Sequence, residues 1–231
     1  MGTIAERLKI ALETIRRTVS EANRPVNSVK LLAVSKTKPV SDIRQAYGAG
    51  HRLFGENYVQ EGIEKIQQLA DLADIEWHFI GPLQSNKTRL VAENFAWVQS
   101  IDRLKIAQRL NQQRDPHKTL NVCIQVNIDQ ETNKAGVLAQ DVELLAKAIS
   151  TLENLTLRGL MAIPQASQSH SKQQQSFSRM QLLFTQLQTK YPQVDTLSMG
   201  MSNDMQLAIE SGSTMVRVGT AIFGTRNQAK S

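Results

Sequence analysis

A lysine lies where a buried strand is predicted to end. Residues 31–34 are consecutive apolar residues, typical of a strand that is buried on both faces. Lys36 follows this run after one serine, at the predicted end of the strand, and Pro39 limits how far the strand can continue. At the carboxyl ends of parallel strands, burial lowers the pKa of an amine and makes it nucleophilic. Lys36 is therefore a candidate to attack a carbonyl group, and the alternative is a solvated loop lysine.

Two segments near the end of the sequence are rich in small residues and suit a phosphate group. The first connects a predicted strand to a helix and includes Ser198 and Ser202. The second follows the last predicted strand and includes Gly219 and Thr220. Small residues let backbone N–H groups approach an anion, and barrels of parallel strands often bind phosphate with the loops after strands seven and eight. The alternative is that these are ordinary turn residues.

Three further side chains are candidates to contact a ligand. Arg217 lies two residues before Gly219 and shares its strand face, so an inward face would bring a permanent cation beside the second small-residue segment. The alternative is a surface or ion-paired arginine. His78 lies between two aromatic residues and either stacks on a ligand or serves as a core histidine. Asn57 either caps a helix or holds a ligand.

Several familiar kinds of site are excluded. The histidines lack metal-ligand spacing with carboxylates, and a single cysteine, Cys123, allows neither a disulfide within the chain nor a thiolate metal centre. Cys123 lies in an apolar run and is expected to be a small core residue. The sequence contains no P-loop and no Gly-x-Ser-x-Gly nucleophile motif.

The elements that must position these residues form a regular alternation of strands and helices. Strands are predicted at residues 31–36, 52–56, 77–81, 96–101, 121–128, 157–163, 195–199 and 214–219. Helices are predicted at residues 42–49, 57–69, 85–94, 102–113, 138–152, 177–190 and 203–211. Regular βα alternation implies a parallel sheet, and eight repeats imply a closed (β/α)8 barrel. The alternative is an open doubly wound sheet, although no G-x-G-x-x-G follows the first strand.

Two segments lie outside the repeating pattern. Residues 4–21 have helical apolar spacing and predict an extra N-terminal helix that covers a barrel end. Residues 165–175 are rich in serine and glutamine and predict a mobile loop.

Composition sets the broad class of the protein. The 231 residues are 41% hydrophobic, which suits one sizeable core and a single domain over residues 1–231. The formal net charge of +6 suits an anionic small molecule. No Lys/Arg cluster with interleaved aromatic residues supports nucleic-acid binding. The sequence contains neither a signal peptide nor a run of about 20 apolar residues, so we expect a soluble, cytoplasmic protein without membrane contact.

Six segments together resemble a known family. They are residues 32–37, 54–61, 77–87, 159–163, 197–202 and 216–224. These segments are similar to the YggS/PROSC family of pyridoxal phosphate homeostasis proteins, and the resemblance covers nearly the whole chain. It implies the TIM barrel of the fold-type III pyridoxal 5′-phosphate (PLP) proteins, such as alanine racemase.

The resemblance also implies a role for each candidate residue. Lys36 is implied to form a Schiff base with the aldehyde of PLP. Residues implied to hold the phosphate are Ser202, Gly219 and Thr220, helped by the turn at Ser198. Residues implied to surround the ring are Asn57, His78 and Met161, together with Arg217 facing the ring nitrogen.

A carrier is favoured over an enzyme. The family has no established turnover and is thought to hold and deliver PLP. An arginine that faces the ring nitrogen disfavours its protonation and weakens the ring as an electron sink, although alanine racemase shares this arginine. Only residues 221–231 follow the last predicted strand, so we expect no second domain to close the site. The main alternative is a small racemase-like PLP enzyme.

The partner expectations follow from the same resemblance. PLP is the expected ligand, and transient contact with PLP-requiring apoenzymes is expected for delivery. No apolar surface stripe in the sequence demands a dimer, so a monomer is expected. A weaker alternative is an interaction protein that binds RNA or a partner through its positive charge.

Overall fold

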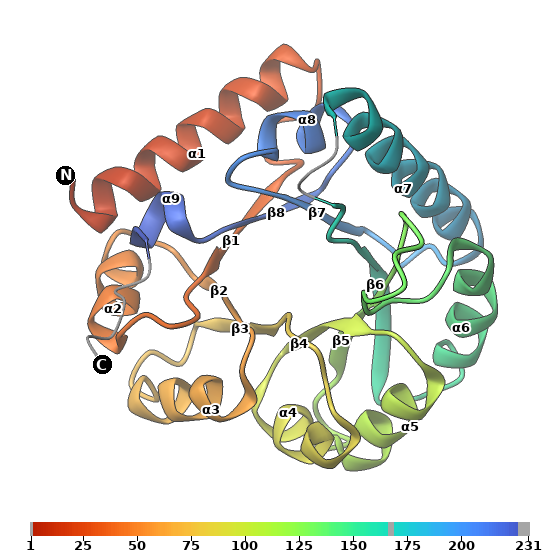
Figure 1. Ribbon diagram of the computed structural model, residues 1–231. Helices are drawn as coiled ribbons and strands as arrows, with labels where there is room; N and C mark the ends of the chain where they lie inside the picture. Colours follow the sequence, from red (N-terminus) through yellow and green to blue (C-terminus); the bar gives the residue numbers. More distant parts are fainter. Residues whose placement is uncertain (1, 166–168, 226–231) are drawn as a thin grey trace.

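The computed structural model describes residues 2–165 and 169–225. Eight parallel strands pair in chain order and close into a barrel, with β1 and β8 as neighbours (Figure 1). The strands are β1 (Lys30–Val34), β2 (Leu53–Glu56), β3 (Glu76–Phe79), β4 (Trp97–Ile101), β5 (Leu120–Gln125), β6 (Leu155–Met161), β7 (Thr196–Met201) and β8 (Met215–Val218). The predicted closed (β/α)8 barrel is confirmed, and the open sheet is not.

Helices surround the barrel on its outside (Figure 1). They are α1 (Ile4–Glu21), α2 (Val40–Gly48), α3 (Val59–Gln68), α4 (Thr88–Asn94), α5 (Leu104–Gln113), α6 (Val142–Ile149), α7 (His170–Lys190), α8 (Met205–Glu210) and α9 (Thr220–Phe223). Short 3-10 helices, η1 (Ser85–Lys87) and η2 (Ala139–Asp141), precede α4 and α6. No described helix is both long and apolar enough to cross a membrane.

The strands divide their side chains between two regions. Because successive side chains of a strand alternate, Leu31 and Ala33 of β1 join the main core under the helices, whereas Leu32 packs in a separate cluster with Ile80 and Met215. These inward residues fill the barrel, which is therefore a packed core and not a pore. Its carboxyl end remains open for a site.

Helix α1 differs from the prediction because it does not cover a barrel end. It packs in the outer ring against α2, α8 and α9 (Figure 1), and the Arg7 side chain donates to the Ile222 carbonyl of α9 over 2.5 Å. The physical reason is the shortness of α9, which covers too little of the outer side of β8 and β1. The buried face of α1, including Leu8 and Ile15, supplies that cover.

The predicted loop over residues 165–175 is wrong for its second half. Helix α7 already begins at His170, with Ser169 as its N-cap accepting from the Lys172 N–H. Glutamine is a good helix former, so its abundance here favours a helix once a cap is present. The first half of the prediction includes residues 166–168, which lie outside the described residues.

Candidate functional site

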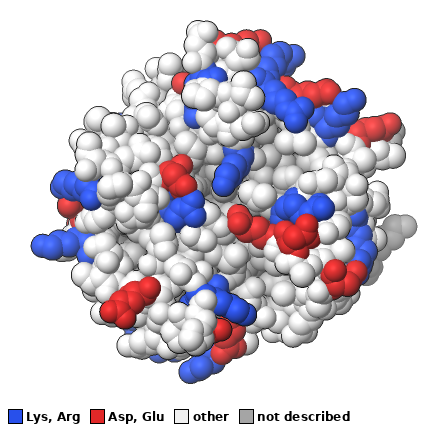
Figure 2. Space-filling view, turned by 180° about the vertical axis from the view of Figure 1, so that it is seen from behind, with Lys and Arg blue, Asp and Glu red and all other residues white. Residues whose placement is uncertain are grey.

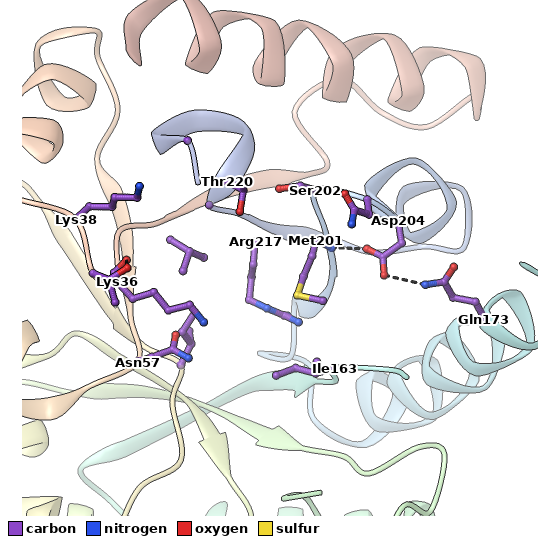
Figure 3. Close-up of a pocket in the computed structure, with 16 residues that line it drawn as sticks. Lys36, Lys38, Asn57, Ile163, Gln173, Met201, Ser202, Asp204, Arg217 and Thr220 are labelled. Carbon is purple, nitrogen blue, oxygen red and sulfur yellow. Dashed lines mark hydrogen bonds between the residues drawn. The ribbon is translucent and has the colours of Figure 1, made fainter. Parts of the chain in front are cut away.

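A cavity of about 580 Å³ opens at the carboxyl ends of the strands (Figure 3). The predicted site residues that line it are Lys36, Asn57, Ser202, Arg217, Gly219 and Thr220. They come from β1, β2, β7 and β8 or from the segments that follow these strands. Lys36 and Arg217 extend into the cavity from different walls (Figure 3). The fold therefore brings together residues separated by up to 184 positions in the chain (220 minus 36).

Lys36 follows β1, and both of its sequence neighbours are held by α3 and β2. The Ser35 hydroxyl donates to Glu56 over 2.6 Å, and the Thr37 N–H donates to Glu61 over 2.5 Å. Thr37 has a φ of 61°, a left-handed conformation that is unusual for a β-branched residue. These contacts fix the backbone on each side of Lys36, so its side chain leaves the strand end in a defined direction.

A buried ionic network supports this turn. The Lys65 ammonium, 5% exposed, donates to the Ser35 carbonyl and to the carboxylates of Glu56 and Glu61 over 2.7–2.8 Å. Burial raises the pKa of Glu56, and the nearby Lys65 opposes that shift. Because a buried carboxylate needs a nearby cation to stay ionised, we infer that Lys65 keeps Glu56 in its charged form at the base of the turn.

Arg217 is a buried cation at the wall of the cavity. Its guanidinium donates to the Ser198 hydroxyl over 2.7 Å and to the Ala162 carbonyl over 2.8 Å. Burial lowers its pKa to about 10, which still leaves the side chain charged near neutral pH. Of the two interpretations of Arg217, the structure has the inward face and not a surface arginine, because only 4% of the residue is exposed and it lines the cavity.

The loops after β7 and β8 form one side of the cavity. The Met201 N–H donates to Asp204 over 2.5 Å, and Gln173 of α7 donates to the other oxygen of that carboxylate over 3.0 Å (Figure 3). Gly219 precedes α9 and lies against β1, since a Cβ there would be 3.2 Å from the Val34 carbonyl oxygen. A side chain at this position would narrow the cavity, so glycine suits it.

Asn57 is not the helix cap that one sequence interpretation offered. Helix α3 begins at Val59, its N-cap residue is Tyr58, and among the described residues no side chain hydrogen-bonds to the N–H groups of its first turn as a cap. The Asn57 backbone is instead covered by Gly81, where a Cβ would lie 2.0 Å from the Asn57 carbonyl oxygen. The Asn57 Oδ1 atom is buried with no hydrogen-bond partner in the described structure. A buried acceptor without a partner on a cavity wall favours a ligand that donates a hydrogen bond.

Three predicted site residues lie outside the cavity lining. His78, Met161 and Ser198 are fully buried inside the barrel. Met161 packs with Trp97 and Cys123, whereas His78 and Ser198 hydrogen-bond to Gln99. They are buried in the barrel interior and do not line the cavity with the other six, although Met161 is the last residue of β6. Ser198 belongs to β7 and not to the turn that follows it.

Other site residues were missed by sequence reasoning. Lys65, Glu61 and Gln173 lie on the sides of α3 and α7 that face the strand ends, and the sequence assigns them no role. The i, i+4 spacing of Glu61 and Lys65 was a usable signal for their ion pair. Asp204 had no comparable signal, because its two donors come from different elements.

Comparison with known proteins assigns the family. Residues 10–227 match the model of the alanine racemase N-terminal domain. The chain is 57% identical, over 99% of its length, to the whole of a Pasteurella multocida protein named pyridoxal phosphate homeostasis protein. It is 51% identical over the full length of both chains to the Escherichia coli K12 protein of that name. The chain belongs to the pyridoxal phosphate homeostasis protein family.

Solved structures agree with this family and with the predicted barrel. PipY of Synechococcus elongatus PCC7942, solved without PLP, superposes with a TM-score of 0.84 at 40% identity, over 96% of this chain and 100% of PipY. PipY with PLP bound gives 0.81 at 38% identity over the same shares. Alanine racemase from Corynebacterium glutamicum superposes with a TM-score of 0.68 at 17% identity. The match covers 99% of this chain and 62% of the racemase, which shows a common fold.

Proposed function

We propose that this chain binds PLP through Lys36 and acts in PLP homeostasis as a carrier and regulator of the cofactor, without catalytic turnover. The observation that carries the proposal is one cavity with an amine and a fixed cation on different walls (Figure 3). The Lys36 amine suits the cofactor aldehyde. The names of the relatives and the PLP-bound PipY structure support the choice of ligand.

The phosphate would lie between the loops after β7 and β8. Ser202, Gly219 and Thr220 line that part of the cavity. Helix α9 begins at Thr220, and the first N–H groups of a helix have no acceptor within the helix, so they are available to an anion. Gly219 lets the backbone approach the anion closely. The Asp204 carboxylate lines the same cavity, where the Met201 N–H and Gln173 donate to its two oxygens and fix its orientation.

Arg217 and Asn57 would address the ring. The Arg217 guanidinium, held by Ser198 and Ala162, would face the ring nitrogen and keep it unprotonated. Asn57 Oδ1, which lacks a partner in the described structure, would accept a hydrogen bond from the cofactor. When bound, PLP supplies an aldehyde that reacts with amines and a ring that withdraws electrons. The ring withdraws electrons less strongly when its nitrogen is unprotonated.

The lining of the cavity supports a carrier more than an enzyme. None of the described lining residues is a histidine, tyrosine or cysteine. Racemisation and related chemistry need positioned acids and bases around the Cα atom of a substrate, and here these would have to come from lysines or from Asp204. The relatives are named for homeostasis and not for a reaction.

Delivery of PLP would involve transient contact with PLP-requiring apoenzymes in the cytoplasm. We infer that the chain acts as a monomer, because exposed large apolar side chains such as Ile10, Leu144 and Leu182 lie on separate helices. Light scattering of the purified protein tests this inference, and a stable dimer would contradict it.

Borohydride reduction tests the attachment site. Purified protein loaded with PLP is reduced, digested and mapped by mass spectrometry, and we expect the pyridoxyl group on the peptide that contains Lys36. The Lys38→Ala variant is the matched control, because Lys38 lines the same cavity but donates to the Thr225 carbonyl. Its map should still show labelled Lys36. A label on another side chain in wild-type protein would overturn the proposal.

Proton exchange separates the carrier from the racemase-like alternative. The loaded protein is incubated with a panel of amino acids in deuterated buffer, and the Cα protons are followed by NMR. A carrier leaves these protons in place. Exchange that requires Lys36 would replace the carrier with a racemase-like enzyme.

A further inference from the structure

A chain of hydrogen bonds crosses the barrel interior from the cavity to the opposite end. The Arg217 guanidinium donates to the Ser198 hydroxyl over 2.7 Å, and this hydroxyl donates to Gln99 Oε1 over 2.6 Å. Gln99 Nε2 lies 2.9 Å from His78 Nδ1, and His78 Nε2 lies 2.9 Å from a Glu76 carboxylate oxygen. These five residues come from β8, β7, β4 and β3.

The inner part of the chain is sealed from solvent, whereas its far end is not. Ser198, Gln99 and His78 have no exposed surface, and Arg217 is 4% exposed. Glu76 begins β3, and 41% of its side chain is exposed at the amino-terminal end of the barrel. Figure 2 shows the molecule from behind Figure 1, with acidic and basic side chains close together near the middle of that face.

The two ends of the chain determine the direction of every bond in it. A guanidinium can only donate and a carboxylate can only accept, whereas a hydroxyl, a primary amide and a neutral imidazole can do both. Because the Glu76 carboxylate can only accept, His78 Nε2–H donates to it and His78 Nδ1 accepts from the Gln99 amide group. Gln99 Oε1 then faces Ser198, whose hydroxyl donates to Gln99 Oε1 and accepts from Arg217.

The surroundings of His78 favour the neutral ring that this direction requires. Burial lowers the pKa of His78, and the charges of Lys30 and Arg158 act in the same sense, while Glu76 opposes them. The ring also stacks on Trp97, with centroids 4.9 Å apart and planes 13° apart, which fixes its plane. The His78 hydrogen bond in turn lowers the pKa of Glu76 and keeps it a carboxylate.

We propose that Glu76 is a positioning residue for Arg217, and that it acts through His78, Gln99 and Ser198 to hold the guanidinium in one orientation at the cavity wall. Loss of the carboxylate would remove the acceptor that sets the direction of the chain. Gln99 could then turn its amide group toward Ser198, so that the Ser198 oxygen would accept from both Gln99 and Arg217 and its own O–H would lose its acceptor. The consequence for PLP binding rests on the proposed function, whereas the consequence for His78 does not.

The test uses the full chain and the isosteric variant Glu76→Gln. An amide at this position can donate or accept, so the bonds from residue 76 to Ser198 can reverse while the shape of the chain is kept and Arg217 still donates. In unloaded wild-type protein, 15N NMR should show His78 only as the Nε2–H tautomer. In Glu76→Gln we expect both tautomers, a changed side-chain N–H signal of Arg217, and a dissociation constant for PLP about threefold higher, equivalent to about 0.7 kcal/mol.

Asp74→Asn is the matched control, since Asp74 is an exposed carboxylate bonded to Tyr47 and Arg52 and lies outside the chain. It should leave the His78 tautomer and the PLP dissociation constant as in wild type. A wild-type His78 in the Nδ1–H form, or a Glu76→Gln protein with unchanged His78 and Arg217 signals, would overturn the inference. Wild-type protein that bound no PLP would overturn the proposed function instead, and the NMR signals would still decide the inference.

Discussion

Arg217 is oriented before any ligand arrives. Its two hydrogen bonds, to the Ser198 hydroxyl and the Ala162 carbonyl, fix the guanidinium at the cavity wall. A group that is already fixed loses little conformational entropy when it binds a ligand, so its interaction contributes more to affinity. Lys36 is half-buried and reaches into the same cavity on a long side chain (Figure 3). The site therefore combines one cation fixed by hydrogen bonds with one amine on a long, half-buried side chain.

His51 makes stability depend on pH. It is 8% exposed, its Nε2 lies 2.8 Å from the Leu53 carbonyl oxygen, and burial lowers its pKa to about 4. The unfolded chain, with a histidine pKa of about 6.5, binds the proton more readily between these values, so stability falls as pH falls through this window. We expect His51 to account for a loss of about 2 kcal/mol in unfolding free energy between about pH 7 and about pH 5.

Urea unfolding at the two pH values, with wild type and His51→Gln, measures this loss. The variant should show a smaller difference between the two pH values, because glutamine does not titrate. His117→Gln is the control, since His117 is exposed, and it should retain the wild-type difference. An equal pH difference in wild type and His51→Gln would contradict the assignment.

At the scale of elements, the turn after β1 depends on α3. Lys65 extends from α3 to Ser35 and Glu56 at the ends of β1 and β2, and Glu61 of the same helix accepts from the Thr37 N–H. The docking of one helix therefore determines the backbone on both sides of Lys36. Stability and site geometry are linked here because they use the same side chains.

Lys65→Met should lower the unfolding free energy by about 3–5 kcal/mol, since it leaves the Glu56 carboxylate buried without its cation. Denaturant unfolding near neutral pH measures the change. The double variant Lys65→Met with Glu56→Gln should recover part of the loss, because it removes the buried charge. A double variant no more stable than Lys65→Met would mean that the cost arises from packing and not from charge.

At the scale of the molecule, the barrel closes through contacts between the two ends of the chain. Lys30 to Ala33 of β1 pair with Met215 to Val218 of β8. Helix α1 covers this seam from outside and packs against α8 and α9 (Figure 1). Lys36, Arg217 and Gly219 lie at the carboxyl end of the same seam. The integrity of the site therefore depends on closure of the whole ring.

Leu8→Ala on the buried face of α1 tests this dependence. Leu8 is 1% exposed, so the substitution should cost about 2–5 kcal/mol of unfolding free energy by leaving a cavity at the seam. Thermal and denaturant unfolding measure the cost. Ile10→Ala is the control on the same helix, because Ile10 is 61% exposed, and it should change stability by less than about 0.5 kcal/mol. Equal effects of the two substitutions would contradict the packing of α1.

The sequence was sufficient wherever the signal was local. Apolar runs and alternation identified all eight strands. The small-residue segments after strands seven and eight were predicted to act together, and Ser202, Gly219 and Thr220 of these segments line one cavity. Element boundaries were less accurate: α6 begins at Val142, four residues later than predicted, because η2 takes the first turn. Caps and turns depend on contacts that periodicity does not contain.

What the sequence determined by itself is the barrel, the family resemblance and the candidacy of Lys36. Only the tertiary structure decided depth along the barrel axis. Gly219 and His78 both belong to inward-facing strand patterns, yet one lines the cavity and the other lies in the sealed interior. Alternation along a strand specifies the side of the sheet, but how far a residue lies from the open end depends on the stagger between neighbouring strands, which is fixed by long-range pairing.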